Sequence, residues 1–137
     1  MNTIAAARCF ASGLVKILVV EEDPEIGMMM ALLLTDAGCL VEVVRNGDTA
    51  MRLAPEHGFD LIIIDLVIHG TSGFELCDRL KENVWLRDIP VLFVAGSPDD
   101  KDRRQAFVHG AADFFVKPFS PMNFVARVLS HTRIKTA

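Results

Sequence analysis

Four consecutive aliphatic residues, Leu61 to Ile64, restrict the fold more than any other feature of this 137-residue chain. A strand with one face in water alternates apolar and polar residues, whereas a strand covered on both faces is apolar throughout. The run is therefore typical of the centre of a parallel sheet, and we expect a strand from Asp60 to Ile64. Asp65 follows directly, so a carboxylate lies where a buried strand ends.

Strand and helix patterns alternate along the rest of the chain. The other four expected strands are Lys16 to Val20, Leu40 to Val44, Pro90 to Val94 and Ala112 to Val116. Such alternation with short connections predicts a parallel sheet with helices on both faces. The expected fold class is therefore α/β, with a single doubly wound sheet of five parallel strands.

Start signals for helices lie between these strands. Asp23-Pro24-Glu25 combines an N-cap, a proline at the first helical position and an acid in the first turn, and Gly38 is the expected stop. We expect the methionines 28–30 of this helix to pack in the core and at its flank. A second helix is expected from Asn46-Gly47-Asp48 to about Glu56.

Three more helices are expected after the central strand. The apolar stripe of the next helix is Phe74, Cys77, Leu80 and Val84. Ser97-Pro98-Asp99-Asp100 repeats the start signal, with Ser97 as the expected cap of a helix that runs to His109-Gly110. Ser120-Pro121 caps the last helix, whose stripe is Phe124, Val125, Val128 and Leu129.

Composition excludes several classes of protein. Apolar residues make up 51% of the chain and charged residues 23%, as in an ordered globular domain. The net charge of −4 argues against nucleic acid as the partner of this domain. No apolar run reaches the roughly 20 residues that a membrane-spanning helix needs. We expect residues 1–13 to be a flexible extension and residues 14–134 to form the domain.

The three cysteines are Cys9, Cys39 and Cys77. They form no CxxC pair, so neither a thiolate metal site nor a redox dithiol is supported. Reduced thiols are the norm in the cytosol, and we expect a cytoplasmic protein without membrane contact.

Charged residues follow three of the expected strands. In a parallel sheet all carboxyl ends meet at one edge, where ligands of such sheets bind. Glu21, Glu22, Asp65 and Lys117 should therefore lie together. Clustered carboxylates need compensating positive charge, which Lys117 and a hard divalent cation such as Mg²⁺ can supply. An aspartate beside Mg²⁺ and a lysine can attack a phosphoryl group.

Four motifs carry a resemblance to a known family. KILVVEEDP, DLIIIDLVIHGTSGFEL, IPVLFVAGS and GAADFFVKPFSP stand in this order, and the chain from Val15 to Arg133 resembles the receiver domain of two-component response regulators. The resemblance implies a flavodoxin-like sheet with strand order 2-1-3-4-5. It also implies a signalling module that accepts phosphate in a Mg²⁺-dependent phosphorelay and is not a multiple-turnover enzyme.

The resemblance assigns roles to particular residues. Asp65 matches the phosphoacceptor and Lys117 the lysine that contacts the phosphoryl group. The implied metal ligands are Glu21, Glu22, Asp65 and the backbone carbonyl of Val67. The peptide before Pro118 is expected to be cis. The implied partners are a histidine kinase or phosphotransfer protein, and a downstream target on the fourth helix, fifth strand and fifth helix.

Several positions depart from the family pattern. Both members of the acidic pair are glutamate, whereas the family usually has at least one aspartate there. Ala95 stands where a threonine or serine hydroxyl is usual, and Phe114 is a tolerated variant at the second switch position. His69 and Gly70 lie where proline is common.

These departures support an alternative, a pseudo-receiver that binds partners without phosphorylation. A small phosphatase that uses Asp65 is disfavoured, because no second aspartate lies two residues further on.

Overall fold

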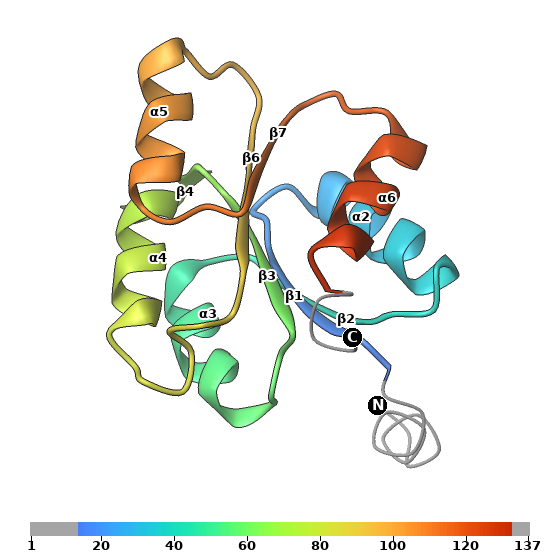
Figure 1. Cartoon of the computed structure of the whole chain (residues 1–137), viewed down its shortest axis with the longest axis horizontal. Helices are drawn as coiled ribbons and strands as arrows, with labels where there is room; N and C mark the ends of the chain where they lie inside the picture. The colour runs from blue at the N-terminus through green and yellow to red at the C-terminus, as the bar shows by residue number, and fades with distance from the viewer. Residues whose placement is uncertain (1–13, 133–137) are drawn as a thin grey trace.

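The computed structural model describes residues 14–132 and places five parallel strands in one sheet (Figure 1). The strands are β1 (Lys16–Val20), β2 (Leu40–Val44), β3 (Leu61–Asp65), β6 (Val91–Ala95) and β7 (Asp113–Val116). They lie in the order β2-β1-β3-β6-β7, and every neighbouring pair is parallel. Counted along the chain this order is 2-1-3-4-5, which confirms the expected flavodoxin-like fold. The expected extension 1–13 and residues 133–134 lie outside the described residues.

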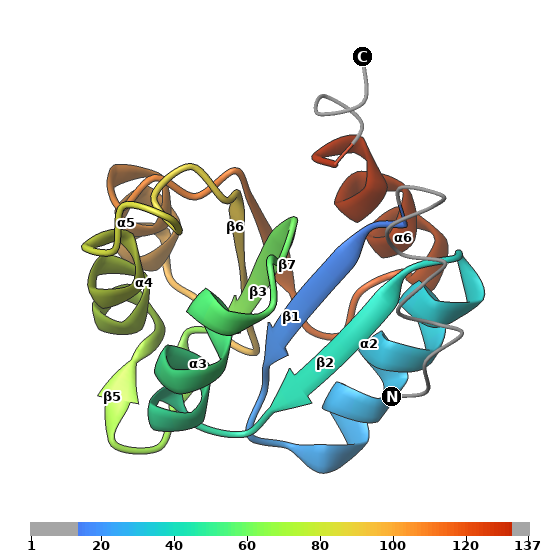
Figure 2. The same ribbon diagram turned by 90° about the horizontal axis from the view of Figure 1, so that it is seen from below.

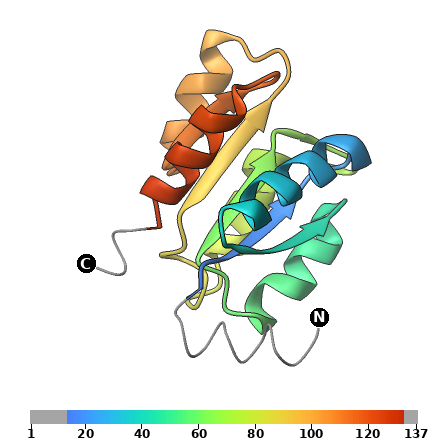
Figure 3. The same ribbon diagram turned by 90° about the vertical axis from the view of Figure 1, so that its right-hand side faces the viewer.

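Helices cover both faces of the sheet (Figures 1 and 2). One face carries α3 (Gly47–Leu53), α4 (Gly73–Lys81) and α5 (Asp100–Val108), and the other carries α2 (Pro24–Asp36) and α6 (Pro121–Ser130). In Figure 3, α2 and α6 lie in front of the strands. All five residues of β3 are buried, as expected for its aliphatic run. Among residues 14–132, no helix has the length and apolar character needed to cross a bilayer.

The central strands end one residue later than expected. β3 ends on Asp65, which pairs with Val94 of β6, and β6 ends on Ala95. Pro90 lies outside β6 because it has no N–H for the ladder, although its carbonyl accepts a hydrogen bond from Ile62 N at 3.0 Å. β7 likewise begins at Asp113 and not at Ala112. Both Asp65 and Ala95 are therefore held by strand geometry.

Two helix ends differ from expectation. The regular part of the second expected helix stops at Leu53, and the 3₁₀ turn η1 (Ala54–Glu56) follows, because Pro55 has no N–H for an α-helical hydrogen bond. α4 ends at Lys81, so Val84 was wrongly included in its stripe and is 62% exposed.

The cap of α5 also differs. Asp99, not Ser97, is the N-cap: its side chain accepts from Asp102 N at 2.8 Å, and the Asp102 side chain accepts from Asp99 N at 3.1 Å. This reciprocal pair satisfies two helix-end donors at once, which a cap at Ser97 with Pro98 behind it does not provide.

Only part of the methionine run packs in the core. Met30 is buried with Leu34 on the inner side of α2. Met28 and Met29 are exposed on the outer side, so the expectation of core and flank packing is wrong for Met28, which is 62% exposed.

Candidate functional site

Three strand ends bring charged side chains together at the carboxyl edge of the sheet. Glu21 follows β1, Asp65 ends β3 and Lys117 follows β7. The backbone fixes the first and last of these positions, because Glu21 N donates to Val44 O at 2.9 Å and Lys117 N donates to Ala95 O at 2.8 Å. The ladder therefore continues past the strand ends and holds both residues beside Asp65.

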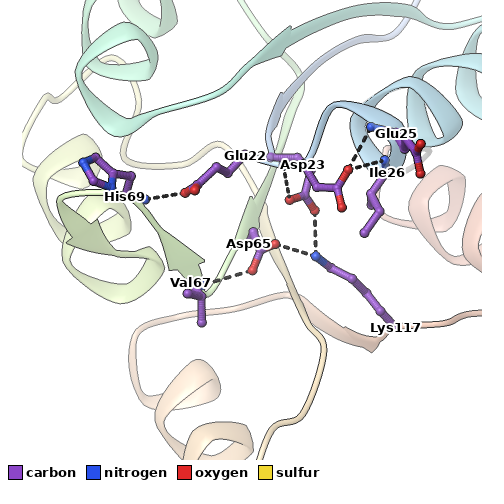
Figure 4. A network of polar contacts seen from close by, with 9 residues as sticks. Glu22, Asp23, Glu25, Ile26, Asp65, Val67, His69 and Lys117 are labelled. Atoms are coloured by element: carbon purple, nitrogen blue, oxygen red, sulfur yellow. Dashed lines mark hydrogen bonds and ion pairs between the residues drawn. The ribbon is translucent and has the colours of Figure 1, made fainter.

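Lys117 contacts two carboxylates (Figure 4). Its Nζ donates to Asp65 Oδ2 at 2.5 Å and lies 2.8 Å from Glu21 Oε1. Glu21 is 2% exposed and Asp65 is 6% exposed, so both carboxylates are largely withdrawn from water. The second oxygen of Asp65, Oδ1, accepts from Val67 N at 3.0 Å. One cation thus compensates two buried anions.

Burial and charge shift the pKa values of this group. Burial raises the pKa of Glu21; the hydrogen bond from Lys117 lowers it, the proximity of Asp65 raises it again, and the net direction is upward. Burial alone lowers the pKa of Lys117, but its hydrogen bonds to Asp65 and Glu21 outweigh burial, so this pKa is raised. Lys117 therefore remains a cation at neutral pH.

The second glutamate points elsewhere. Glu22 is exposed, and its Oε2 accepts from the backbone N of His69 at 2.7 Å (Figure 4). His69 lies in the hairpin formed by β4 (Val67–Ile68) and β5 (Thr71–Ser72), which follows Asp65. The bond ties this hairpin to the end of β1. Of the expected acidic pair, only Glu21 faces Lys117.

Gly73 lets the hairpin and α4 approach the strand that carries Asp65. Gly73 N donates to Leu66 O at 2.9 Å. A Cβ at this position would lie 2.6 Å from the backbone oxygen of Asp65, closer than real Cβ atoms come. The start of α4 is therefore held directly against the backbone of the candidate nucleophile.

The donor set suits a hard divalent cation in part. Glu21 and Asp65 supply adjacent carboxylates, and the buried Oε1 of Glu21 has Nζ of Lys117, 2.8 Å away, as its one cationic contact among the described residues. Such an oxygen can accept a cation such as Mg²⁺. Within residues 14–132, however, no three acidic, histidine or cysteine side chains are grouped closely enough to hold a metal. A carboxylate from Glu22 joins the other two only if it leaves His69 N.

Of the two expected switch positions, Ala95 lies next to this group, because its backbone oxygen accepts from Lys117 N. Ala95 is 4% exposed at the end of β6 and brings a methyl group where the family usually has a hydroxyl. Phe114 of β7 is 6% exposed, and the guanidinium of Arg103 on α5 lies 5.6 Å from its ring centroid. The peptide bond between Lys117 and Pro118 is cis.

An open depression surrounds the charged group. Its lining residues are Glu21, Glu22, Asp23, Pro24, Ile26, Arg45, Asp65, Val67 and Lys117. Sequence reasoning missed Arg45, whose Nε donates to the backbone oxygen of Glu22 at 3.2 Å. Arg45 directly follows the expected strand Leu40 to Val44, so strand direction already predicts it at the same edge as Lys117.

Comparisons with known proteins find a family model and several relatives that match most of the chain. The family model described as the response regulator receiver domain matches residues 17–129. The transcriptional activator protein IrlR of Burkholderia pseudomallei is 37% identical over 118 residues, which are 86% of this chain and 50% of IrlR. The transcriptional regulatory protein ResD of Bacillus subtilis is 34% identical over 113 residues, which are 82% of this chain and 46% of ResD. The chain thus spans about half the length of these relatives.

A solved structure has the same fold and superposes on most of this chain. A putative response regulator from Chloroflexus aurantiacus superposes with a TM-score of 0.83 at 28% identity, over 88% of this chain and 98% of its own.

Proposed function

Since the chain belongs to the response regulator receiver family of two-component systems, we propose that Asp65 accepts a phosphoryl group from a histidine kinase or phosphotransfer protein. The observation that carries this proposal is the contact of Lys117 Nζ with Asp65 Oδ2 at 2.5 Å. A carboxylate at an open strand edge, with a fixed cation beside it, is arranged as a nucleophile whose product is also anionic.

The transfer exchanges one bond to phosphorus for another. A carboxylate oxygen of Asp65 attacks the phosphorus of a phosphohistidine, the P–O bond forms, and the P–N bond breaks. The imidazole nitrogen leaves with the electron pair. Lys117 lies where it can neutralise an oxygen of the transferred group, and Glu21 keeps Lys117 at this place when Asp65 gives up its own charge.

Mg²⁺, the cation typical of the family, would neutralise charge on the transferring oxygens when bound. Glu21 and Asp65 would hold it through their side chains and Val67 through its carbonyl. Glu22 would join them after releasing His69 N. Because this release costs a hydrogen bond, we expect a weaker cation site than one with a shorter aspartate at position 22.

The test of phosphorylation is intact-mass measurement after incubation with Mg²⁺ and a small acyl phosphate. Wild type should gain one phosphoryl group, and Asp65→Asn should gain none. Asp60→Asn serves as a second control. Asp60 precedes the same strand, but its side chain accepts a hydrogen bond from Lys16 N at 2.9 Å, away from Lys117. An unmodified wild type, under conditions that label another receiver, would overturn the proposal.

The downstream partner is proposed to bind the surface of α5, β7 and α6. Phe107 and Val108 on α5 support this, since they are 55% and 75% exposed. Arg103 on the same helix packs on Phe114 of β7, so a change at the strand can reach the helix surface.

Ala95 supports a second candidate function, a pseudo-receiver that binds its partner without phosphate. A methyl group cannot hydrogen-bond a phosphoryl oxygen, and the Glu22–His69 bond holds the hairpin without any cation. In this case partner affinity should be unchanged in Asp65→Ala. A large loss of affinity in that variant, measured by calorimetry, would exclude the second candidate.

A further inference from the structure

An exposed apolar surface lies where α2 and α6 pack beside each other, on the face shown in Figure 3. Two depressions that share Leu33 and Asp36 hollow it. Met28, Leu32 and Met122 are 62%, 63% and 84% exposed. We call it the α2–α6 surface, defined by Met28, Met29, Leu32, Leu33, Met122 and Val125.

The helical repeat shows that the apolar side chains of this surface are not needed to cover the sheet. Met30 and Leu34 on the inner side of α2 already cover the sheet and are buried. Met28, Met29 and Leu32 lie on the outer side at helical spacing, where a helix that only covers a core presents polar residues. A contiguous exposed apolar surface of this kind marks a binding site.

The charges around the surface select the occupant. Among the described residues that line the two depressions, the charged ones are Glu25 and Asp36, and both are acidic. A second copy of the same surface would bring carboxylates to carboxylates without a cation. The fitting occupant is apolar and carries positive charge.

Residues 1–13 of this chain have that chemistry. Their only charged side chain is Arg8, and it lies between Ile4 and Phe10 in a stretch without any acid. The described chain starts near the carboxyl end of α2, since Leu40 N, just beyond that helix, donates to Val15 O at 2.8 Å and Val15 packs against the same core as Leu33. Thirteen extended residues reach about 45 Å, whereas α2 is about 20 Å long. A tethered segment also has an effective concentration in the millimolar range.

We propose that residues 1–13 bind the α2–α6 surface of their own molecule, covering Met28, Met29 and Met122, with Arg8 paired to Glu25 or Asp36. This proposal does not depend on phosphorylation. It places an intramolecular segment along the helix whose first turn reaches the candidate site through Ile26.

A spin label on Cys9 tests the proposal in the full chain. Cys39 and Cys77 are buried, and burial raises the pKa of both thiols, that of Cys77 to about 11, so a thiol-specific nitroxide label should select Cys9. With ¹³C-labelled methionine methyl groups, we expect paramagnetic broadening at Met28, Met29 and Met122. Met51 is the internal control, because it packs on the opposite face of the sheet. Arg8→Glu should weaken docking about twofold to fivefold, and the broadening should decrease accordingly.

Two results would overturn the proposal. One is paramagnetic broadening that is equally strong at Met28 and Met51, or that is absent at both. The other is broadening in a mixture of spin-labelled protein without ¹³C and ¹³C-labelled Cys9→Ser protein, because the segment would then bind a second copy.

Discussion

Lys117 determines the electrostatics of the site at the level of single residues. It is the cation shared by Glu21 and Asp65, and both carboxylates are almost fully buried. Glutamate at position 21 is long enough to reach Lys117 from the end of β1, and glutamate at position 22 is long enough to reach the hairpin at His69. The two glutamates therefore have separate contacts, although they are adjacent in the sequence.

Glu21→Gln should become more favourable to stability, relative to wild type, as pH rises from 4.5 to 7. The pKa of Glu21 in the folded protein is raised above its ordinary value of 4.5. The folded state then holds this proton more tightly than the unfolded chain, so wild type loses stability as pH rises through this window. Glutamine is neutral over this whole pH range, so Glu21→Gln does not lose this contribution to stability. The attraction of Lys117 for the Glu21 carboxylate is already part of the net raised pKa, so it adds no further dependence on pH.

Urea unfolding at several pH values measures this difference, with the exposed Glu42→Gln as the control. A difference between Glu21→Gln and wild type that is flat, or that falls with pH, would contradict the direction assigned to the Glu21 pKa.

At the level of the elements, close backbone contacts position the site. Gly73 at the start of α4 touches the backbone of Asp65, and Asp99 and Asp102 fix the start of α5. The Lys117 position depends on β7 and on β6, because Lys117 N, just past β7, donates to Ala95 O at 2.8 Å.

Gly73→Ala should destabilise the protein by about 2 kcal/mol or more, because its Cβ would meet the backbone oxygen of Asp65 at 2.6 Å and backbone cannot move as a side chain can. Gly96→Ala is the matched control, since its added Cβ would meet nothing within 4 Å beyond its own chain neighbours. Chemical denaturation of both variants measures their free energies of unfolding. Equal losses of stability would show that the close approach of Gly73 to Asp65 does not exclude a Cβ.

Asp99→Ala should cost about 1 kcal/mol of stability, because it removes the side-chain acceptor for Asp102 N and leaves a helix-end donor without a partner. Ser97→Ala should change stability by less than about 0.5 kcal/mol, since Ser97 is not the cap. The order of the two unfolding midpoints decides between these caps.

An ion-pair group connects β7 with the end of α6. Burial raises the pKa of Asp113, but hydrogen bonds from Arg127 and His131 lower it more, and the net pKa lies below 3.8. The Asp113 ion pairs therefore stabilise the folded protein above pH 3.8, and this stabilisation is lost as pH falls through the pKa that Asp113 has in the folded state. Asp113→Asn should cost about 1 kcal/mol at pH 7, a modest value because Arg127 is 40% exposed.

The loss should shrink towards zero in acid, and urea titrations at pH 7 and about pH 3 compare the two conditions. Exposed Asp88→Asn is the control. An effect of equal size at both pH values would mean that packing and not charge is lost.

For the whole molecule, the sheet order brings distant charges together. The aliphatic run before Asp65 indicated a central strand, and the parallel topology then placed Glu21, Asp65 and Lys117 at one edge. These features were predictable because they follow from periodicity and from strand direction. The hydrogen bond between Glu22 and His69 was not predictable, because it depends on a side-chain rotamer and on the shape of a hairpin, and neither follows from sequence periodicity.

The start of α5 shows the same limit. Ser97 and Asp99 are both suitable caps by residue type, and only the reciprocal bond with Asp102 decides between them. The exposed side of α2 was misjudged for a related reason, since a helix with apolar residues on every side does not reveal which side meets the sheet.

The proposed function requires that Asp65 itself carries the phosphoryl group. Borohydride reduces an aspartyl phosphate to homoserine, so peptide mass spectrometry after treatment with Mg²⁺, an acyl phosphate and borohydride locates the modified residue. We expect homoserine at position 65 in wild type and none in Asp65→Asn. Homoserine at another aspartate, or none in a wild type that still shows a phosphoryl adduct, would contradict it.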